Sequence, residues 1–260
     1  MQKSDRKLDL VLLIIWPIVS SAVSLFLKGG PLWSLIVFLI IPSAFLSFKN
    51  KSFIKKSAVF SAIIGVPIVI IFDYIGHYSK SWFVGHSIFP YKIFGLVPVE
   101  SALWGFFLIY YTVMFYEYFL DRHLSKKLKT PRLKYLLILI LLLIFVFSSI
   151  LFITPKLLNI RYFYLIWGML MVFIPLLISL LKFPNLSKKF FLAGSYFFFF
   201  SFIYELTALK LGWWKFIGDD FIGWVSIFKL SFPFEELFFW FLLLAMATLS
   251  YYEFFDDDEK

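Results

Sequence analysis

Eight long apolar runs, separated by short breaks rich in charge, glycine and proline, dominate this sequence of 260 residues. Each run has about 20 residues, the length that an α-helix needs to cross the hydrocarbon layer of a membrane. A soluble domain is apolar over about half of its residues, whereas this chain has 62% hydrophobic residues and a mean hydropathy of +0.89. The sequence therefore predicts an all-α integral membrane protein with eight transmembrane helices. The runs lie approximately at 9–27, 32–48, 57–77, 95–119, 133–153, 162–181, 190–210 and 230–252.

The distribution of positive charge predicts how these helices cross the membrane. Most of the 25 Lys and Arg residues fall in the N-terminal segment and in the second, fourth and sixth loops. Basic loops are typically cytoplasmic, so we expect a multi-pass protein of the cell membrane with both termini cytoplasmic. Because the net charge of +9 is divided among separate loops and forms no continuous basic face, we expect membrane lipid and no nucleic acid as partners.

Two stretches of the chain contain the same residues in the same order, which predicts an internal repeat. An acidic residue precedes a tryptophan by nine positions in both, Asp73 before Trp82 and Glu205 before Trp214, and a Pro-x-Glu motif follows, at 98–100 and at 233–235. Further matched pairs are Trp33 and Trp167, Pro42 and Pro175, Lys49 and Lys182, and Glu117 and Glu253. Since each half has an even number of helices, both halves enter the membrane from the same side. We predict two parallel tandem four-helix repeats, at 1–125 and 126–260, joined by a basic loop.

Several carboxylates lie where an apolar run would otherwise be uninterrupted. Placing a charged side chain at the centre of a membrane helix costs at least about 2.5 kcal/mol, so such residues typically face a bundle interior and are candidates for function. They are Asp73, Glu100, Glu205, Glu235 and Glu236, all at helix ends predicted to be extracytoplasmic. We expect the acids of both halves to converge on one site.

The Pro-x-Glu motif has a structural explanation as well as a functional one. Proline suits the first turn of a helix, and a carboxylate just after it is stabilised by the helix dipole; this alternative applies most to Glu100. The adjacent Glu235 and Glu236 project about 100° apart on a helix of 3.6 residues per turn, so we expect each to have its own partner. A neutral carboxylic acid among these residues could then donate a proton that an ionised carboxylate accepts.

The second stretch contains "GWWKF" followed by "PFEELFFW", and the first contains "PVESALWGFF". An acid, a Trp-rich turn and P-x-E-E-x-x-F-F in two tandem copies resemble the lycopene cyclase domain family, the integral-membrane type that occurs as a heterodimer or a fused chain. The resemblance covers mainly the third and fourth helices of each half. The first copy departs from the family pattern because Ser101 stands where a second acid is common.

The resemblance implies a lycopene β-cyclase-like isomerase of carotenoid biosynthesis, an intramolecular lyase whose ligand is an acyclic carotenoid or another long prenyl lipid. It implies catalytic roles for Glu235, Glu236, Glu205, Glu100 and Asp73, with Glu235 or Glu236 as the proton donor. Aromatic faces stabilise cations, so residues near the acids are candidates for substrate binding: Trp82, Trp104, Trp213, Trp214, Phe239 and Trp240. Trp82 and Trp213 could equally be interfacial anchors.

No cofactor is expected, because the net reaction is an isomerisation and no Gly-rich dinucleotide motif is present. We also expect no metal, since His77, His86 and His123 all lie in the first half. The absence of later histidines also disfavours an intramembrane protease of the CAAX-processing type. A proton-coupled carrier or a binding protein for a lipid or prenyl compound remains the alternative.

Overall fold

The computed structural model describes residues 3–85, 87–121 and 132–256, with the side chains of 3–5 excluded. Eight helices in these ranges are long and apolar enough to span a membrane, which is the architecture of a multi-pass membrane protein. The prediction of an all-α membrane fold is thus confirmed at the level of helix content and number. The predicted boundary between residues 125 and 126 lies outside the described residues. The spans are Arg6–Leu27, Pro31–Lys49, Lys51–Tyr78, Val99–Phe119, Leu133–Ile153, Phe163–Lys182, Pro184–Leu211 and Glu236–Asp256.

The spans of the first half are built from several helical segments. They are α1 (Lys3–Leu27), α2 (Pro31–Ser34), η1 (Leu35–Ile40), α3 (Ile41–Lys49), η2 (Lys51–Phe53), α4 (Ile54–Phe60), η3 (Ser61–Gly65), α5 (Val66–Tyr78) and α6 (Val99–Phe119). Those of the second half are α7 (Leu133–Ile153), η4 (Pro155–Leu158), α8 (Phe163–Trp167), η5 (Gly168–Phe173), α9 (Ile174–Lys182), η6 (Pro184–Leu186), α10 (Ser187–Leu211), η7 (Glu236–Leu243) and α11 (Leu244–Asp256).

Three of the π-helical segments directly precede a proline near the start of the next α-helix. Pro42 follows η1, Pro67 follows η3 and Pro175 follows η5. A proline inside a helix removes one amide donor and its ring clashes with the carbonyl one turn earlier. A π turn is wider than an α turn and accommodates the missing amide donor and the proline ring. Each of these spans therefore continues through its proline.

Six short strands follow α5 and α10, and the sequence interpretation missed them. They are β1 (Trp82–Val84), β2 (Lys92–Ile93), β3 (Val97–Pro98), β4 (Trp214–Phe216), β5 (Trp224–Ile227) and β6 (Leu230–Pro233). The fourth and eighth predicted runs accordingly began too early, because 97–98 and 230–233 are strands that precede the helices. In each half the last two strands form an antiparallel hairpin, whose final residue is the proline of the Pro-x-Glu motif.

The remaining two strands pair with each other across the two halves. β1 and β4 are antiparallel, and Trp82 lies opposite Phe216 while Val84 lies opposite Trp214. Because β1 directly follows α5 and β4 directly follows α10, this pairing brings the ends of those two helices to one end of the bundle. The third and seventh spans therefore run in the same direction.

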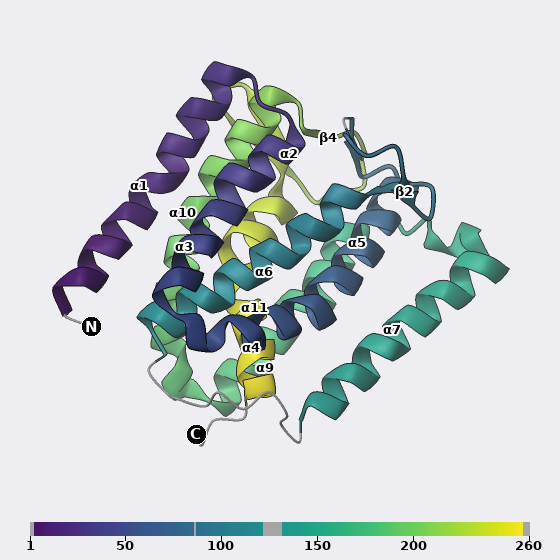
Figure 1. Cartoon of the computed structure of the whole chain (residues 1–260). Helices are drawn as coiled ribbons and strands as arrows, with labels where there is room; N and C mark the ends of the chain where they lie inside the picture. Colours follow the sequence, from purple (N-terminus) through teal and green to yellow (C-terminus); the bar gives the residue numbers. More distant parts are fainter. Residues whose placement is uncertain (1–2, 86, 122–131, 257–260) are drawn as a thin grey trace.

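Figure 1 shows the strands at one end of the bundle and both chain termini at the other. It also shows α1 and α7 on opposite flanks, and their spans are among the three with the smallest buried share. The spans that contain α6, α10 and α11 are the most buried. Side chains that meet between the strands and these central helices are therefore enclosed by protein.

Candidate functional site

A cavity of about 130 Å³ lies at the strand-bearing end of the bundle. Its walls come from both halves and combine carboxylates with aromatic rings. The sheet of β1 and β4 contributes Trp82, Val84, Trp214 and Phe216 to the lining. The other lining residues are Pro31, Ser34, Leu35, Val69, Phe72, Asp73, Pro98, Glu100, Ser101, Trp104, Tyr164, Tyr204, Glu236 and Trp240.

Glu236 and Glu205 form the most enclosed acid pair of this site. Glu236 lies at the start of η7 and Glu205 lies in α10, and the two carboxyl groups lie close enough to interact directly. A hydrogen bond between two carboxyl oxygens requires a proton on one of them. The pair is thus able to share one proton, and both side chains are almost completely buried.

Each member of the pair also accepts a hydrogen bond from an aromatic residue. Trp214 Nε1 donates to Glu205 Oε1 over 2.8 Å, and the Tyr164 hydroxyl donates to Glu236 Oε2. Only Glu236 of the two lines the cavity, while Glu205 lies behind it. The proton of the pair can thus reach a ligand through Glu236, and Glu205 is positioned to hold the charge that remains.

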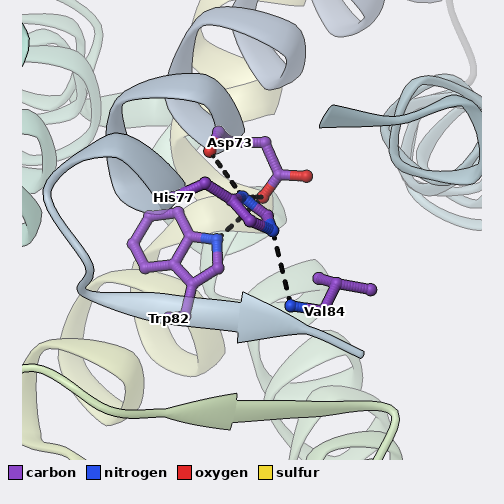
Figure 2. Close-up of polar contacts among 4 residues, drawn as sticks. All are labelled: Asp73, His77, Trp82 and Val84. Carbon is purple, nitrogen blue, oxygen red and sulfur yellow. Dashed lines mark hydrogen bonds and ion pairs between the residues drawn. The ribbon is translucent and has the colours of Figure 1, made fainter. Parts of the chain in front are cut away.

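Asp73 is the carboxylate that the first half contributes in the corresponding place (Figure 2). Trp82 Nε1 donates to Asp73 Oδ1 over 2.9 Å, which repeats the contact of Trp214 with Glu205. The sequence separation is nine residues in both pairs. Ser101 occupies the lining position that corresponds to Glu236, so the first half offers a hydroxyl where the second half offers a carboxyl.

His77 lies beside Asp73 (Figure 2). The Val84 amide donates to His77 Nε2 over 3.4 Å. The other ring nitrogen, Nδ1, lies 2.8 Å from the Asp73 carbonyl oxygen and 3.9 Å from Asp73 Oδ1. His77 thus links the end of α5 to β1 next to the Asp73 carboxyl group.

Glu235 and Glu100 occupy equivalent positions in the two halves, and each accepts a backbone hydrogen bond from the loop before the hairpin of its own half. The Ile222 amide donates to Glu235 Oε1 over 2.8 Å, and the Ile88 amide donates to Glu100 Oε1 over 2.7 Å. Ser87 Oγ also donates to Glu100 Oε2. Burial raises the pKa of the Glu235 carboxyl above its usual range, and the amide of Ile222 partly opposes this shift. Glu100 lines the cavity and Glu235 does not.

The aromatic candidates divide into a wall of the cavity and a part of the core. Trp240 stacks on Trp104 at 4.9 Å and 15° and lies parallel to Phe72 at 6.1 Å and 7°. Trp213, in contrast, donates to the Gly29 carbonyl over 2.7 Å and packs against Phe38 in the buried core. Trp213 lines neither the first cavity nor the second cavity described below. Phe239 lies over Gly168 in a second, deeper cavity.

Sequence reasoning missed two polar residues of the site. Tyr164 donates to Glu236 from α8, although a single tyrosine among apolar residues gave no signal of this contact. Tyr204 lies one residue before Glu205, lines the cavity, and its hydroxyl lies 3.3 Å from Ser34 Oγ. The pairing of Glu205 with Glu236 was also missed, since nothing in the sequence fixes which acid meets which.

A second polar cluster lies at the opposite end of the bundle and joins the two halves reciprocally. The Tyr116 hydroxyl donates to Glu253, and the Tyr252 hydroxyl donates to Glu117. Lys189 Nζ lies 2.7 Å from Asp121 Oδ1, and Lys56 pairs with Asp256. Among the described residues, carboxylate oxygens of Glu117, Asp121 and Asp256 lie within 4.8 Å of one another, which is close enough to hold a metal ion. The two lysines already pair with two of these three acids.

No family model, curated protein or solved structure matches this chain. The functional argument therefore depends on the site itself.

Proposed function

We propose that this protein is a carotenoid cyclase of the lycopene cyclase type, which closes a ring at the acyclic end of a polyene by acid–base chemistry within the membrane. The observation that carries the proposal is the arrangement around one cavity: a buried pair of carboxyl groups, a separate carboxyl group, and stacked aromatic rings that line the same space. These are the three kinds of group that the reaction needs. No redox step is involved, and the atoms of substrate and product are the same.

In this mechanism Glu236 donates the proton of the Glu205–Glu236 pair to the terminal double bond of the polyene. The new carbon–hydrogen bond leaves a carbocation on the neighbouring carbon, and the electron pair of an internal double bond attacks it to close the ring. Asp73 then accepts a proton from a ring carbon, which restores a double bond. Proton exchange from Asp73 back to the pair completes the cycle.

The cation that forms between these two proton transfers needs an environment without water. The faces of Trp104, Trp240 and Phe72 offer a negative quadrupole to it, and these rings line the same cavity as the acids of the two halves. The sheet of β1 and β4 covers the same cavity with four further side chains. Excluding water in this way prevents capture of the cation as an alcohol.

We further propose that the two halves are parallel tandem repeats and that the cavity lies toward the extracytoplasmic side. The halves share the contact of a tryptophan with an acid nine residues earlier, a Pro-x-Glu that accepts loop amides, and reciprocal Tyr–Glu bonds. The register of β1 with β4 is that of two equivalent strands related by a two-fold axis. The basic loops define the cytoplasmic side, with both termini on it.

Expression in a host that accumulates lycopene tests the proposal. We expect chromatography of the pigments to reveal one-ring or two-ring products that disappear with Glu236→Gln. Unchanged lycopene in cells whose membranes contain abundant wild-type protein would refute the assignment, and other acyclic prenyl compounds would then be assayed.

A proton-coupled carrier or a binding protein for a prenyl lipid is the second candidate. The buried acids that face one cavity favour it too, because a carrier couples transport to protonation of such groups. It predicts that ligand is bound or moved without change. Recovery of unchanged ligand from purified protein, together with proton uptake on binding, would support the carrier and contradict the cyclase.

A further inference from the structure

A second cavity of about 70 Å³ adjoins the first. The two share five lining residues, which are Val69, Phe72, Trp104, Tyr164 and Trp240. The stacked rings of Phe72, Trp104 and Trp240 thus form a common wall, with the carboxyls on one side and the second cavity on the other. A ligand that reaches the carboxyls passes this wall if it continues deeper into the bundle.

The second cavity extends along the axis of the last span. Glu236 opens η7 in the wall of the first cavity, whereas Thr248 and Tyr251 lie in α11 and line the second. At about 1.5 Å per helical residue, the distance from Glu236 to Tyr251 is roughly 20 Å. The two cavities together therefore follow about two-thirds of the roughly 30 Å apolar layer.

The lining of the second cavity is suited to hydrocarbon and not to a polar group. Its described residues are mostly aliphatic or aromatic, and their polar side-chain groups are the hydroxyls of Tyr164, Thr248 and Tyr251 and the indole N–H groups of Trp104, Trp167 and Trp240. Of these, Tyr164 donates to Glu236 and Tyr251 donates to the Met171 carbonyl over 3.1 Å. A buried polar group on a ligand would find few partners here, which makes its entry unfavourable.

The helices around the second cavity contain π-helical segments, a feature often found at binding sites. Three π-helical segments contribute to its lining: η3 through Ile64, η5 through Gly168, Met171 and Val172, and η7 through Phe239 and Trp240. Such π turns inside α-helices occur frequently at functional sites. Tight packing surrounds the cavity as well, since a Cβ at Gly168 would lie 2.3 Å from Phe239. The space is therefore retained within an otherwise closely packed wall.

We propose that the second cavity holds the unreacted chain of the ligand whose end lies at Glu236. The inference rests on the proposed function and specifies its substrate class: a linear, apolar chain that enters end-on, with its long axis along the bundle and one end reacting at a time. A chain with a polar group or a closed ring close behind its acyclic end is excluded, because that part would lie between the stacked rings or in the second cavity.

A photoreactive probe tests where the chain lies without requiring turnover. An acyclic prenyl chain with a diazirine at its far end is bound to purified full-length protein, both wild type and Glu236→Gln, and the adducts are mapped by mass spectrometry. We expect adducts on η5 and α11, near Met171 and Thr248, that excess unlabelled acyclic carotene suppresses. Adducts confined to the exposed flanking helices α1 and α7, or adducts that the competitor leaves unchanged, would overturn the proposal.

Filling the second cavity gives an independent measurement. Thr248→Phe and Val172→Phe should each lower suppressible labelling by about tenfold, the loss typical of a misfit in an apolar pocket, while labelling by a chain short enough to end in the first cavity persists. Leu242→Phe is the matched control, because Leu242 lies in the same span with 40% of its surface exposed. Equal labelling of all three variants by the long probe would contradict the proposal.

The two assays separate this inference from the proposed function. Suppressible labelling in the second cavity without any ring formation refutes the cyclase and retains the chain-binding site. Ring formation with labelling elsewhere retains the cyclase and refutes the chain-binding site.

Discussion

The two halves of this protein hold an acid in the same way but give it different neighbours. In both, a tryptophan donates to a carboxylate nine residues earlier, Trp82 to Asp73 and Trp214 to Glu205. In the second half Glu236 adds another carboxyl, whereas the first half has Ser101 at the matching position. The comparison teaches that one scaffold can place a pair of carboxyl groups at one part of a cavity wall and a single carboxyl group at another, which is the kind of difference that separates a proton donor from an acceptor.

The largest effect should come from the acid that distinguishes the second half. Glu236→Gln removes the group that donates the proton, and we expect turnover to fall by about 10² to 10⁴, the usual contribution of a general acid. Pigment analysis and a membrane immunoblot measure activity and protein together. Glu235→Gln is the matched control, since Glu235 accepts the Ile222 amide and does not line the cavity. An equal loss in both variants would sink the assignment.

The first half should contribute the proton acceptor. Asp73→Asn keeps an oxygen that accepts from Trp82 but cannot take up a proton, so we expect a loss of about 10² in turnover. Ser101→Ala should change turnover far less, because its hydroxyl has no assigned step. Single-turnover rates in purified protein check both. A Ser101→Ala variant as inactive as Asp73→Asn would show that the halves do not differ as proposed.

The tryptophans should matter less than the acids that they hold. Trp82→Phe and Trp214→Phe each remove a hydrogen bond to a carboxyl group, which is worth about 1.5 kcal/mol or more and corresponds to roughly tenfold in rate. We expect both variants to retain binding of the acyclic chain, measured with the diazirine probe. Loss of probe labelling in either variant would mean that the tryptophan contacts the ligand instead of positioning the acid.

His77 should give a smaller effect, since the corresponding residue of the second half is Leu209. His77→Leu removes the hydrogen bond that the Val84 amide donates to His77. Such a bond contributes about 1 kcal/mol, so we expect a fewfold loss in turnover. Turnover of His77→Leu, normalised to the amount of protein in the membrane, checks this. A loss as large as that of Asp73→Asn would assign His77 a direct role in the reaction.

The smallest effect concerns stability and pH. Burial raises the pKa of Glu235 above its ordinary value of 4.5. The unfolded chain then ionises first as the pH rises, so the contribution of Glu235 to stability is fully present at pH values below 4.5 and is lost as the pH rises through the folded pKa. Thermal unfolding in detergent should therefore lose stability over this window in the wild type and less in Glu235→Gln. Parallel curves for the two proteins would contradict this.

The helices could be predicted from the sequence, and the contacts between them only in part. Hydropathy suffices to find spans because each must be apolar along its whole length. The contact of Trp82 with Asp73 was anticipated only as a matched spacing, since the sequence separates these residues by nine positions and the chain must turn between them. Pairing of Glu205 with Glu236 depends on how α10 packs against η7, which no local pattern encodes.

The strands were missed for a different reason. They have two to four residues each, too few for an alternating pattern to stand out among apolar neighbours. The turn between β5 and β6 places Phe228 and Lys229 in the left-handed region, at φ of 50° and 65°. Asparagine and glycine are the usual residues there, so the sequence carried no turn signal. Trp213 was a candidate for substrate binding, and the sequence did not reveal that it packs in the core. A tryptophan of the core and a tryptophan of a cavity can have the same kinds of neighbours in the sequence.

The reciprocal bonds at the other end of the bundle have a consequence for how the protein is made. Glu117 receives its hydrogen bond from Tyr252, which the ribosome adds 135 residues later. At about 5 to 20 residues per second, the first half waits roughly ten seconds in the membrane before that partner is synthesised. During this interval Glu117 lacks the hydrogen bond from Tyr252, and this contact does not yet join the two halves. Biogenesis, and not only the finished fold, therefore depends on the final turns of α11.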